Sequence, residues 1–538
     1  MSPTRTKKTT GFVSFVGGGP GDPGLLTVRA VSALAAADVV LVDAIAREQL
    51  LEHCLPGVEV VDATELDLAE RAKVIVNSAK LGSRVVRLFD GDGGVFDALA
   101  EEAEAVVKAK LPIEIVPGVS STTAVSSYAG IPATDRRTHA LHVIDAGPEA
   151  PEPDWATLAS TTGTLVLVNC VGSIAKVAGA LIEHGRRPDT PVAVTTRGTT
   201  RQQRSVVSTL DNVERDAGAL TPPGVVVVGD VVKRRERLSW WETLPLFGWK
   251  VLVPRTREQA PALSSQLAGF GAVPIEVPTI AVEPPRTPQA MDRAIRGLVD
   301  GRYAWLALTS VNALRAIREK VEELGLDARA LAGVKVACVG DVTAEAVAEW
   351  GIVADLVPDG EQSSEGLLAG WPEFEDNYGA PDRVLAPRAD IATDTLIAGL
   401  AARGWQVDDV TAYRTVRAAP PPADIREAIK TGGFDAVLFT SSSTVRNLVG
   451  IAGKPHASSV IAVIGPATAA TAKELGLRVD VQSPSPSVAL LAEALAEHGR
   501  ERREQGDLLP PGKANRAKLT ARSGRAGKSA ARVSAKTG

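Results

Sequence analysis

The sequence predicts an α/β protein with several folded units, and two observations support this prediction. Short runs of Val, Leu and Ile alternate with segments of helical periodicity along most of the 538 residues. The second half of the chain also contains an internal repeat, which predicts a pair of similar lobes. At roughly 150 residues per domain, the length corresponds to three or four folded units.

The first module is expected to contain buried strands that helices cover on both faces. Its apolar runs are continuous rather than alternating, which is typical of interior strands in an α/β sheet. The segments 26–37 and 101–110 have helical periodicity between such runs. An aromatic, proline-containing segment at 239–250 is interpreted as the junction with the second module. The predicted strands are 12–16, 38–43, 84–88, 113–116, 164–168, 191–196 and 224–229.

The repeat in the second half consists of three pairs of segments in the same order. This order predicts two lobes with parallel sheets and a ligand-binding cleft between them. Lobe 1 is expected at 250–281 and 424–498, and lobe 2 at 286–415. Proline-rich segments at 282–288 and 417–424 are interpreted as stiff, extended linkers between the lobes. The paired segments are 251–255 with 384–388, 305–317 with 437–449, and 335–352 with 460–477.

The charge of the chain is unevenly distributed. Residues 501–538 hold ten Lys or Arg and three Asp or Glu, which leaves −12 for the rest of a chain whose net charge is −5. The segments 1–10 and 501–538 are predicted to be disordered because they contain almost no large apolar residues. An acidic body argues against a specific nucleic-acid partner.

Cysteine and histidine content excludes several classes of protein. Cys54, Cys170 and Cys338 are too few and too scattered for a disulfide framework, and the six histidines show no metal-ligand spacing. No apolar run approaches the ~18–20 residues of a membrane span. We therefore expect a cytoplasmic protein without a metal site and without a membrane partner.

A glycine-rich loop follows the first predicted strand. Gly19 to Gly24 form a literal GxGxxG, and Asp43 follows 19 residues later, as in a dinucleotide-binding fingerprint. Pro20 and Pro23 remove two of the backbone N–H donors that such a loop uses to hold a pyrophosphate. A loop that binds another small molecule, an NAD-type loop and a purely structural turn remain open on these residues alone.

Five ordered segments of the first module resemble uroporphyrinogen-III C-methyltransferases over about 11–245. They include VGGGPGDPGLLT, RVVRLFDGDGGVF, IEIVPGVSSTTAVSSYAGIPATDR, PDTPVAVTTRGTT and PPGVVVVGDVV. The resemblance implies a two-lobed tetrapyrrole methylase that binds S-adenosyl-L-methionine and methylates uroporphyrinogen III toward precorrin-2. It implies a homodimer as one possible assembly, and Asp43 as a base. The cofactor-binding residues that it implies are Pro20, Gly91, Asp92, Val95, Ser120, Ser121, Asn169 and Gly198.

The first module also departs from the family pattern. Phe89, Asp90 and Gly93 replace a lysine, a glycine and a proline, and Asp135 stands where a basic or polar partner is expected. The stretch 60–73 lacks the Lys-Arg pair and the histidine of the family. A substrate rich in carboxylates is repelled by such acidic positions. The alternative is a catalytically inactive docking or regulatory module attached to an active synthase.

The second module resembles uroporphyrinogen-III synthases over about 250–498. The resemblance rests on VLVPRTREQAPALSSQLAGFGAVPIEVPTIAV, WLALTSVNAL, VACVGDVTAEAV, FDAVLFTSSSTV and IAVIGPATAATAKELG, among others. It implies cyclisation of hydroxymethylbilane to uroporphyrinogen III with inversion of the last pyrrole ring, and no cofactor. Tyr413 is implied as the acid or hydrogen-bond donor that assists departure of the hydroxyl. The implied substrate-binding residues are Thr309, Ser310, Thr343, Arg388, Thr440, Ser441, Ser442 and Thr468.

Each of these residues also has a purely structural interpretation. The Ser and Thr residues can cap helices, and Tyr413 can pack at a strand end. We expect a bifunctional enzyme of tetrapyrrole biosynthesis, in which the product of one module is the substrate of the other.

Overall fold

The computed structural model describes residues 11–43, 50–255, 260–375, 381–391, 394–507 and 510–511. The chain forms two compact units, which divide in the sequence between Trp249 and Lys250. Unit 1 also includes Leu267–Val273 and Gly499–Pro510. Within the described residues, each unit is built on two five-stranded sheets.

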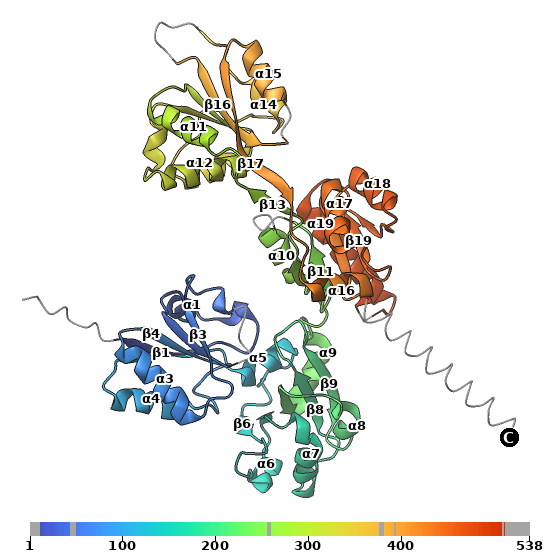
Figure 1. Ribbon diagram of the computed structural model, residues 1–538. Coiled ribbons are helices and arrows are strands. Elements are labelled where there is room, and N and C mark those ends of the chain that lie inside the picture. The colour runs from blue at the N-terminus through green and yellow to red at the C-terminus, as the bar shows by residue number, and fades with distance from the viewer. Residues whose placement is uncertain are drawn as a thin grey trace, which may run out of the picture. The chain divides into compact units, whose positions relative to one another are not determined.

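The first sheet of unit 1 is parallel and has the order β3-β2-β4-β1-β5. Helix α1 packs on one face, and α3 and α4 pack together on the other (Figure 1). Asp67 begins α3 with a capping box, since its carboxylate accepts from the Glu70 amide and Glu70 accepts from the Asp67 amide. The elements are β1 (Phe12–Gly17), α1 (Val28–Ala35), β2 (Val39–Val42), β3 (Glu59–Asp62), α3 (Leu68–Lys80), β4 (Arg84–Phe89), α4 (Leu99–Lys108) and β5 (Ile113–Val116).

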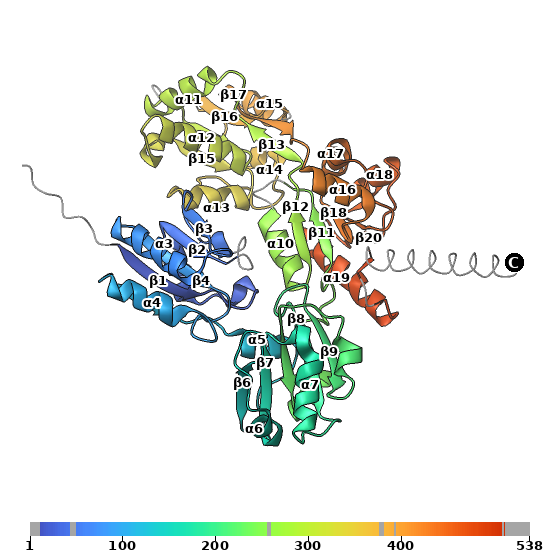
Figure 2. The same ribbon diagram turned by 60° about the horizontal axis from the view of Figure 1, so that its bottom comes forward.

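The second sheet of unit 1 is mixed and has the order β6-β7-β10-β8-β9, because β10 runs antiparallel to both of its neighbours. Helices α6, α7 and α8 contribute to the core on one face, and α5 to the core on the other (Figure 2). The elements are α5 (Ser121–Tyr128), β6 (Leu141–Asp145), α6 (Trp155–Ser160), β7 (Thr164–Val168), α7 (Ile174–Glu183), β8 (Pro191–Thr196), β9 (Arg204–Thr209), α8 (Val213–Ala217), β10 (Gly224–Val228) and α9 (Arg235–Leu238).

The predicted strands of the first module are all present, but the sequence analysis missed β3, β6 and β9. Each of these three is an edge strand of its sheet. An edge strand is only partly buried, and β3 has three exposed residues out of four. A continuous apolar run is therefore not required there, and the signal used to find the other strands is absent.

Lobe 1 of unit 2 has the sheet order β12-β11-β18-β19-β20. Its strands β11, β18, β19 and β20 run parallel. Helices α16, α17 and α18 contribute to one core of this lobe. The elements are β11 (Lys250–Val253), α10 (Ala260–Gly269), β12 (Val273–Glu276), α16 (Ala423–Thr431), β18 (Ala436–Phe439), α17 (Ser442–Ala452), β19 (Val460–Val463), α18 (Pro466–Glu474), β20 (Val481–Gln482) and α19 (Val488–Glu504).

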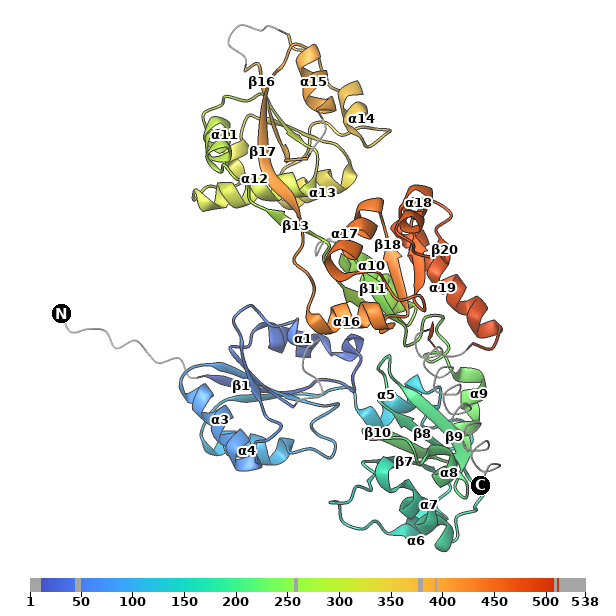
Figure 3. The same cartoon turned by 45° about the vertical axis from the view of Figure 1, so that its right-hand side comes forward.

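Lobe 2 of unit 2 has the sheet order β13-β17-β16-β14-β15. Helices α11, α12 and α13 cover one face, and α14 and α15 cover the other (Figure 3). The elements are β13 (Ile280–Glu283), α11 (Gln289–Val299), β14 (Trp305–Leu308), α12 (Val311–Glu323), β15 (Lys335–Cys338), α13 (Asp341–Glu349), α14 (Ser364–Ala369), β16 (Arg383–Ala389), α15 (Thr395–Ala402) and β17 (Gln406–Arg417).

The structure corrects the predicted linkers between the lobes of unit 2. Residues 280–283, which the prediction divided between lobe 1 and a linker, form strand β13 in the sheet of lobe 2. This strand pairs antiparallel with the end of β17, in register from Ile280 opposite Arg417 to Glu283 opposite Arg414. The two chain segments that connect the lobes are therefore paired as a β-ladder at this point and are not separate extended linkers.

The start of the predicted tail is also wrong. Helix α19 continues to Glu504, and the Arg502 guanidinium pairs with Asp507 at 2.9 Å. The side chains of Leu491 and Leu495 are buried and anchor the first part of this helix. Once a helix has formed it can extend by another turn without further apolar residues. Residues 1–10, 508–509 and 512–538 lie outside the described residues.

Arg87 on β4 is fully buried and gathers acidic groups around it. Its guanidinium donates to Glu102 Oε2 and to Asp43 Oδ2, each at 2.9 Å. Asp90 follows β4 and is exposed to solvent. Partial desolvation, helped by the negative charges of Asp43 and Asp97, raises the pKa of Asp90 to about 6 despite the opposing effect of Arg87.

Asp90→Asn is expected to stabilise unit 1 at neutral pH. Because the pKa of Asp90 is higher in the folded chain, ionised Asp90 costs stability above about pH 6 and costs none below about pH 4. Because the Asp90 carboxyl is exposed, solvent screening limits the expected gain to about 1 kcal/mol. Thermal unfolding of the full chain near pH 7.5 and near pH 4 measures this difference.

The control for this prediction is Glu149→Gln, which changes an exposed carboxylate of the same unit. This substitution should leave the midpoint of thermal unfolding unchanged at both pH values. If the unfolding midpoint of Asp90→Asn rose equally at both pH values, the ionisation of Asp90 would not be the cause of the stabilisation.

Candidate functional site

Three loops of the first sheet meet through their backbones at its carboxyl edge. Gly17 ends β1, Gly91 follows β4 and Gly118 follows β5, and these three strands are neighbours in the sheet. A Cβ added to Gly118 would lie 2.0 Å from the Gly91 carbonyl oxygen, and one added to Gly17 would lie 2.4 Å from the Gly118 nitrogen. Only glycine permits this approach, so the loops are held at fixed positions relative to one another.

The loop after β1 and the loop after β4 are also paired by hydrogen bonds. The Gly19 N–H donates to the Gly91 carbonyl at 3.1 Å, and the Gly91 N–H donates to the Gly19 carbonyl at 2.9 Å. Gly91 has a φ of 65°, and a Cβ there would meet the Ser121 nitrogen at 3.4 Å. The structure thus brings together the predicted residues Pro20, Gly91 and Ser121, with Ser120 as the N-cap of α5.

The second sheet of unit 1 completes this arrangement from the other side. Gly198, after β8, packs on α5, where a Cβ would lie 2.4 Å from the Val125 side chain. The Asp22 N–H donates to Thr199 Oγ1 at 3.1 Å, and the Tyr128 hydroxyl donates to Asp22 Oδ2 at 2.8 Å. The loops 19–22, 91–95, 118–121 and 197–200 therefore form a continuous set of contacts, which we call the loop ring.

Asp92 is the carboxylate of the loop ring that is suited to polar ligand groups. Its side chain is half-buried, and Oδ1 accepts from the Gly94 N–H at 3.0 Å. Among the described residues, Oδ2 of Asp92 has no hydrogen-bond partner in the structure. Val95 is 37 % exposed and lies in the same turn, where its N–H donates to the Asp92 carbonyl. Such a turn offers an acceptor for hydroxyl groups beside an apolar side chain.

Asp43 and Asn169 are placed differently. Asp43 pairs with the buried Arg87, which holds the carboxylate at the carboxyl end of β2, in the same parallel sheet as the loops of Gly17 and Gly91. Asn169 donates to Asp145 Oδ1 at 3.1 Å, and no hydrogen bond of its side chain among the described residues reaches the loop ring. The sequence analysis had not singled out Asp22 or Thr199, since a contact between residues so distant in sequence leaves no local signal.

Both lobes of unit 2 place their hydroxyl-rich loops where the connections on the sheet change direction. In lobe 2, β14 leads to β15 on one side and β16 leads to β17 on the other, while β14 and β16 are adjacent. In lobe 1, β11 and β18 have the same relation. Loops that diverge at such a point leave a crevice outside the carboxyl ends of the strands, where α/β proteins bind ligands.

Tyr413 and Ser310 meet at this edge of lobe 2. Ser310 follows β14 and caps α12, since its Oγ accepts from the Ala313 N–H at 3.1 Å. The Ser310 hydroxyl is also hydrogen-bonded to the Tyr413 hydroxyl at 3.1 Å. Tyr413 lies on β17 and is 9 % exposed. The structure thus joins a predicted catalytic residue to a predicted substrate-binding residue, although 103 positions separate them.

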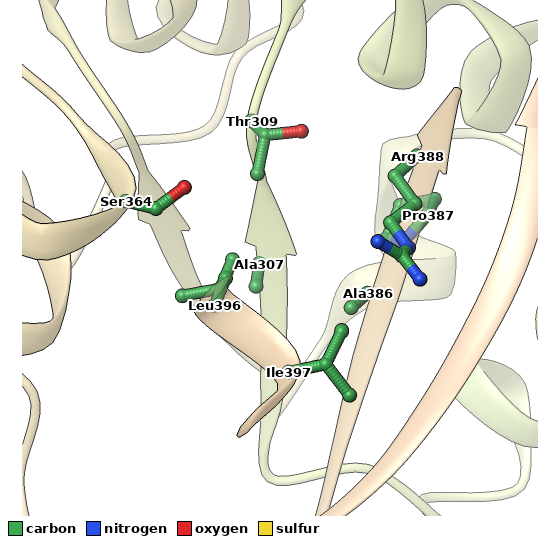
Figure 4. Close-up of a pocket in the computed structure, with 8 residues that line it drawn as sticks. All are labelled: Ala307, Thr309, Ser364, Ala386, Pro387, Arg388, Leu396 and Ile397. Carbon is green, nitrogen blue, oxygen red and sulfur yellow. The ribbon is translucent and has the colours of Figure 1, made fainter. Parts of the chain in front are cut away.

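Thr309 and Arg388 line a small pocket of about 70 Å³ between β14 and β16. Figure 4 shows their side chains around it together with that of Ser364. Arg388 donates to Asp409 Oδ1 at 2.6 Å and to Asp394 Oδ1 at 2.9 Å, and the hydrogen bond with Asp409 is the main cause of its raised pKa. The two carboxylates neutralise this arginine, so its charge is already compensated before a substrate carboxylate approaches.

In lobe 1, the predicted hydroxyls lie at the start of α17. Ser441 is the N-cap and forms a capping box with Thr444, and the Ser442 hydroxyl donates to the Ala467 carbonyl at 3.0 Å. Thr440 is half-buried beside them. These positions combine helix capping with access to the carboxyl edge of the sheet.

Thr343 and Thr468 occupy equivalent places on α13 and α18. They are only 5 % and 4 % exposed. Side chains this deeply buried are not accessible to a substrate, which argues against direct contacts by either threonine. The sequence could not show this, because a residue in the first turn of a helix can point inward or outward.

The described part of the chain holds no cluster of three or more His, Cys, Asp or Glu that could bind a metal ion. It also contains no helix that is long and apolar enough to cross a membrane.

Comparison with known proteins matches both units to families. Residues 13–214 match the model of the Tetrapyrrole (Corrin/Porphyrin) Methylases, and residues 261–493 match that of Uroporphyrinogen-III synthase HemD. The Porphyrin biosynthesis protein HemD of Ruminiclostridium josui is 32 % identical over 492 residues, which cover 88 % of this chain and 96 % of that protein.

Two further relatives match parts of the chain. The Uroporphyrinogen-III C-methyltransferase of Bacillus subtilis (strain 168) is 33 % identical over 365 residues, or 65 % of this chain and 74 % of that protein. The S-adenosyl-L-methionine-dependent uroporphyrinogen III methyltransferase of Methanosarcina barkeri is 39 % identical over 242 residues, or 43 % of this chain and 95 % of that protein. With the loop ring in unit 1 and the hydroxyl loops in unit 2, these matches show that the chain belongs to the family of porphyrin-biosynthesis proteins that join a tetrapyrrole methylase to a uroporphyrinogen-III synthase.

Proposed function

We propose that unit 2 cyclises hydroxymethylbilane to uroporphyrinogen III and that unit 1 methylates this product with S-adenosyl-L-methionine toward precorrin-2. The observation that carries the proposal for unit 1 is the loop ring, in which three loops of the first sheet are fixed by backbone contacts and the loop 197–200 joins them through the Asp22–Thr199 hydrogen bond. The observation that carries it for unit 2 is the Ser310–Tyr413 pair at the carboxyl edge of lobe 2.

The residues of the loop ring fit S-adenosyl-L-methionine. Gly91 and Gly198 allow close packing against the start of α5 and against Val125, which fixes the backbone on which a flat ligand would lie. Asp92 would accept from ribose hydroxyls, and Val95 would contact an apolar part of the cofactor. When bound, the cofactor supplies an electrophilic methyl group on sulfur. Asp43, held by Arg87, would take the proton that the macrocycle loses from another position once its ring carbon has been methylated.

The departures at Phe89 and Gly93 do not disrupt these contacts. Phe89 is buried at the end of β4, and Gly93 packs on its ring, where a Cβ would lie 2.6 Å away. The exchange of lysine for phenylalanine is thus matched by the exchange of proline for glycine. This compensation favours a cofactor-binding unit over an inactive docking module.

The synthase step needs a proton donor for the departing hydroxyl and a surface that holds the folded chain. A Ser310 hydroxyl that donates to Tyr413 Oη leaves the phenolic proton for the substrate hydroxyl, which then departs as water. The hydroxyl loops and helix N-termini of both lobes offer donors to the many carboxylates of the substrate. The tetrapyrrole itself would supply the electrons for ring closure, so no cofactor is required.

Assembly and location follow from the same proposal. Unit 1 would be the site of homodimer formation, the partners would be tetrapyrroles without specific nucleic acid, and the enzyme would work in the cytoplasm.

Asp92→Asn is expected to weaken binding of S-adenosylhomocysteine about tenfold, because a hydrogen bond to a charged acceptor becomes one to a neutral group. Titration calorimetry on the full chain measures the dissociation constant. Glu59→Gln, an exposed change on edge strand β3, is the control and should bind as the unaltered chain does. Absence of heat with the unaltered chain would refute cofactor binding by unit 1.

Tyr413→Phe is expected to lower the rate of uroporphyrinogen III formation about a hundredfold, because the proton donor is lost. Initial rates from hydroxymethylbilane, with the isomers separated by chromatography, give this value. Tyr303→Phe is a matched control. Tyr303 precedes β14, and its hydroxyl donates a hydrogen bond to Asp408 at the opposite edge of the same lobe. An unchanged rate of isomer III formation by Tyr413→Phe would exclude this tyrosine as the acid.

A further inference from the structure

The turn 197–199, which belongs to the loop ring, has an unusual backbone. Arg197 has a φ of 49° and Thr199 a φ of 63°. A β-branched residue such as threonine rarely adopts a positive φ, and such a conformation is strained. A turn of this kind persists only where the surrounding structure holds it. The question is therefore which side chains hold Thr199.

Gln203 holds the turn from within the protein. Its side chain is 4 % exposed, and Oε1 accepts from the Thr199 N–H at 2.8 Å. Its Nε2 donates to the Tyr128 carbonyl at 3.2 Å and to Glu242 Oε1 at 2.8 Å. Both ends of this amide are thus used, and its orientation is fixed by an acceptor on one side and a donor on the other.

Glu242 is the centre of the same network. Its Oε1 also accepts from the Ser205 hydroxyl at 2.6 Å, and Oε2 accepts from the Arg235 guanidinium at 2.9 Å. The Glu242 carbonyl accepts from Arg503 Nη2 at 2.9 Å. Arg503 lies in the segment 499–510, which packs as part of unit 1. A residue near the end of the sequence therefore contributes to the support of the turn.

We propose that Gln203 and Glu242 are positioning residues, which hold the strained turn 197–199 in the conformation that closes the loop ring around the cofactor. The proposal rests on cofactor binding by unit 1. Thr199 Oγ1 accepts the Asp22 N–H and so connects the turn to the loop after β1. Without Gln203, the Thr199 N–H loses its acceptor, the turn relaxes to a negative φ, and this connection is lost.

The test uses Gln203→Ala in the full chain, with Gln202→Ala as the matched control. Gln202 is the neighbouring glutamine, but it is exposed, and among the described residues its side chain bonds only that of Arg197. Its backbone N–H donates to Thr200 Oγ1 at 3.1 Å, a hydrogen bond that alanine retains. Calorimetry with S-adenosylhomocysteine should give an approximately tenfold higher dissociation constant for Gln203→Ala and an unchanged one for Gln202→Ala. Synthase turnover of both variants should equal that of the unaltered chain.

Hydrogen exchange provides a readout that does not depend on the ligand. In Gln203→Ala, amide exchange should become at least about tenfold faster in peptides covering 197–200 and stay unchanged in β8 and β10. Faster exchange across those strands would mean that Gln203 stabilises the core of the sheet, which would overturn a positioning role. Glu242→Gln, which keeps the shape of the side chain, should shift the same two readouts in the same direction by a smaller factor.

The outcomes separate this inference from the proposed function. If the unaltered chain binds S-adenosylhomocysteine and Gln203→Ala binds it equally well, the positioning role is overturned and cofactor binding stands. If the unaltered chain does not bind S-adenosylhomocysteine, both are overturned. Weaker binding of S-adenosylhomocysteine by Gln203→Ala, together with faster amide exchange confined to the turn, supports the positioning role.

Discussion

The close backbone contact between Gly17, Gly91 and Gly118 is the constraint on which the rest of unit 1 depends. With no Cβ between them, the loops after β1, β4 and β5 touch directly, and the hydrogen bonds between Gly19 and Gly91 fix their register. The loops of the second sheet then add to this fixed base through Gly198 and Thr199. A site assembled in this way is positioned by the main chain, so side chains around it can change while its shape is kept.

Charge is arranged differently in the two units, and in each of them an arginine close to the candidate site is already paired with carboxylates. In unit 1, the charge of the buried Arg87 is compensated by ion pairs with Glu102 and Asp43. In unit 2, Arg388 is compensated by Asp409 and Asp394. Recognition of carboxylate-rich tetrapyrroles would therefore rely on hydroxyl groups and on N–H groups at helix N-termini, which bind anions without a net positive charge. An acidic protein can thus act on an acidic substrate.

The chain joins a methylase-like unit to a synthase-like unit. The relative from Ruminiclostridium josui, which this chain matches over 96 % of its length, bears the name of a porphyrin-biosynthesis protein, and both parts of the chain match families that act on tetrapyrroles. The segment 499–510 follows the synthase fold in sequence and packs within unit 1. The C-terminal end of α19 is therefore a part of the methylase-like unit as well as the end of the synthase sequence.

The amino-acid sequence is enough to predict the α/β class, the interior strands, the repeat in the second half and the positions of the glycine and hydroxyl loops, because continuous apolar runs and local turn residues carry these features. It did not determine the edge strands β3, β6 and β9, whose partial burial requires no apolar run. The folded chain is needed to see that Ser310 meets Tyr413, that Gln203 supports Thr199, that Arg388 is already paired, and that Thr343 and Thr468 are buried. These are contacts between residues far apart in the chain or orientations of single side chains, and both are set by packing, which no local pattern of residues records.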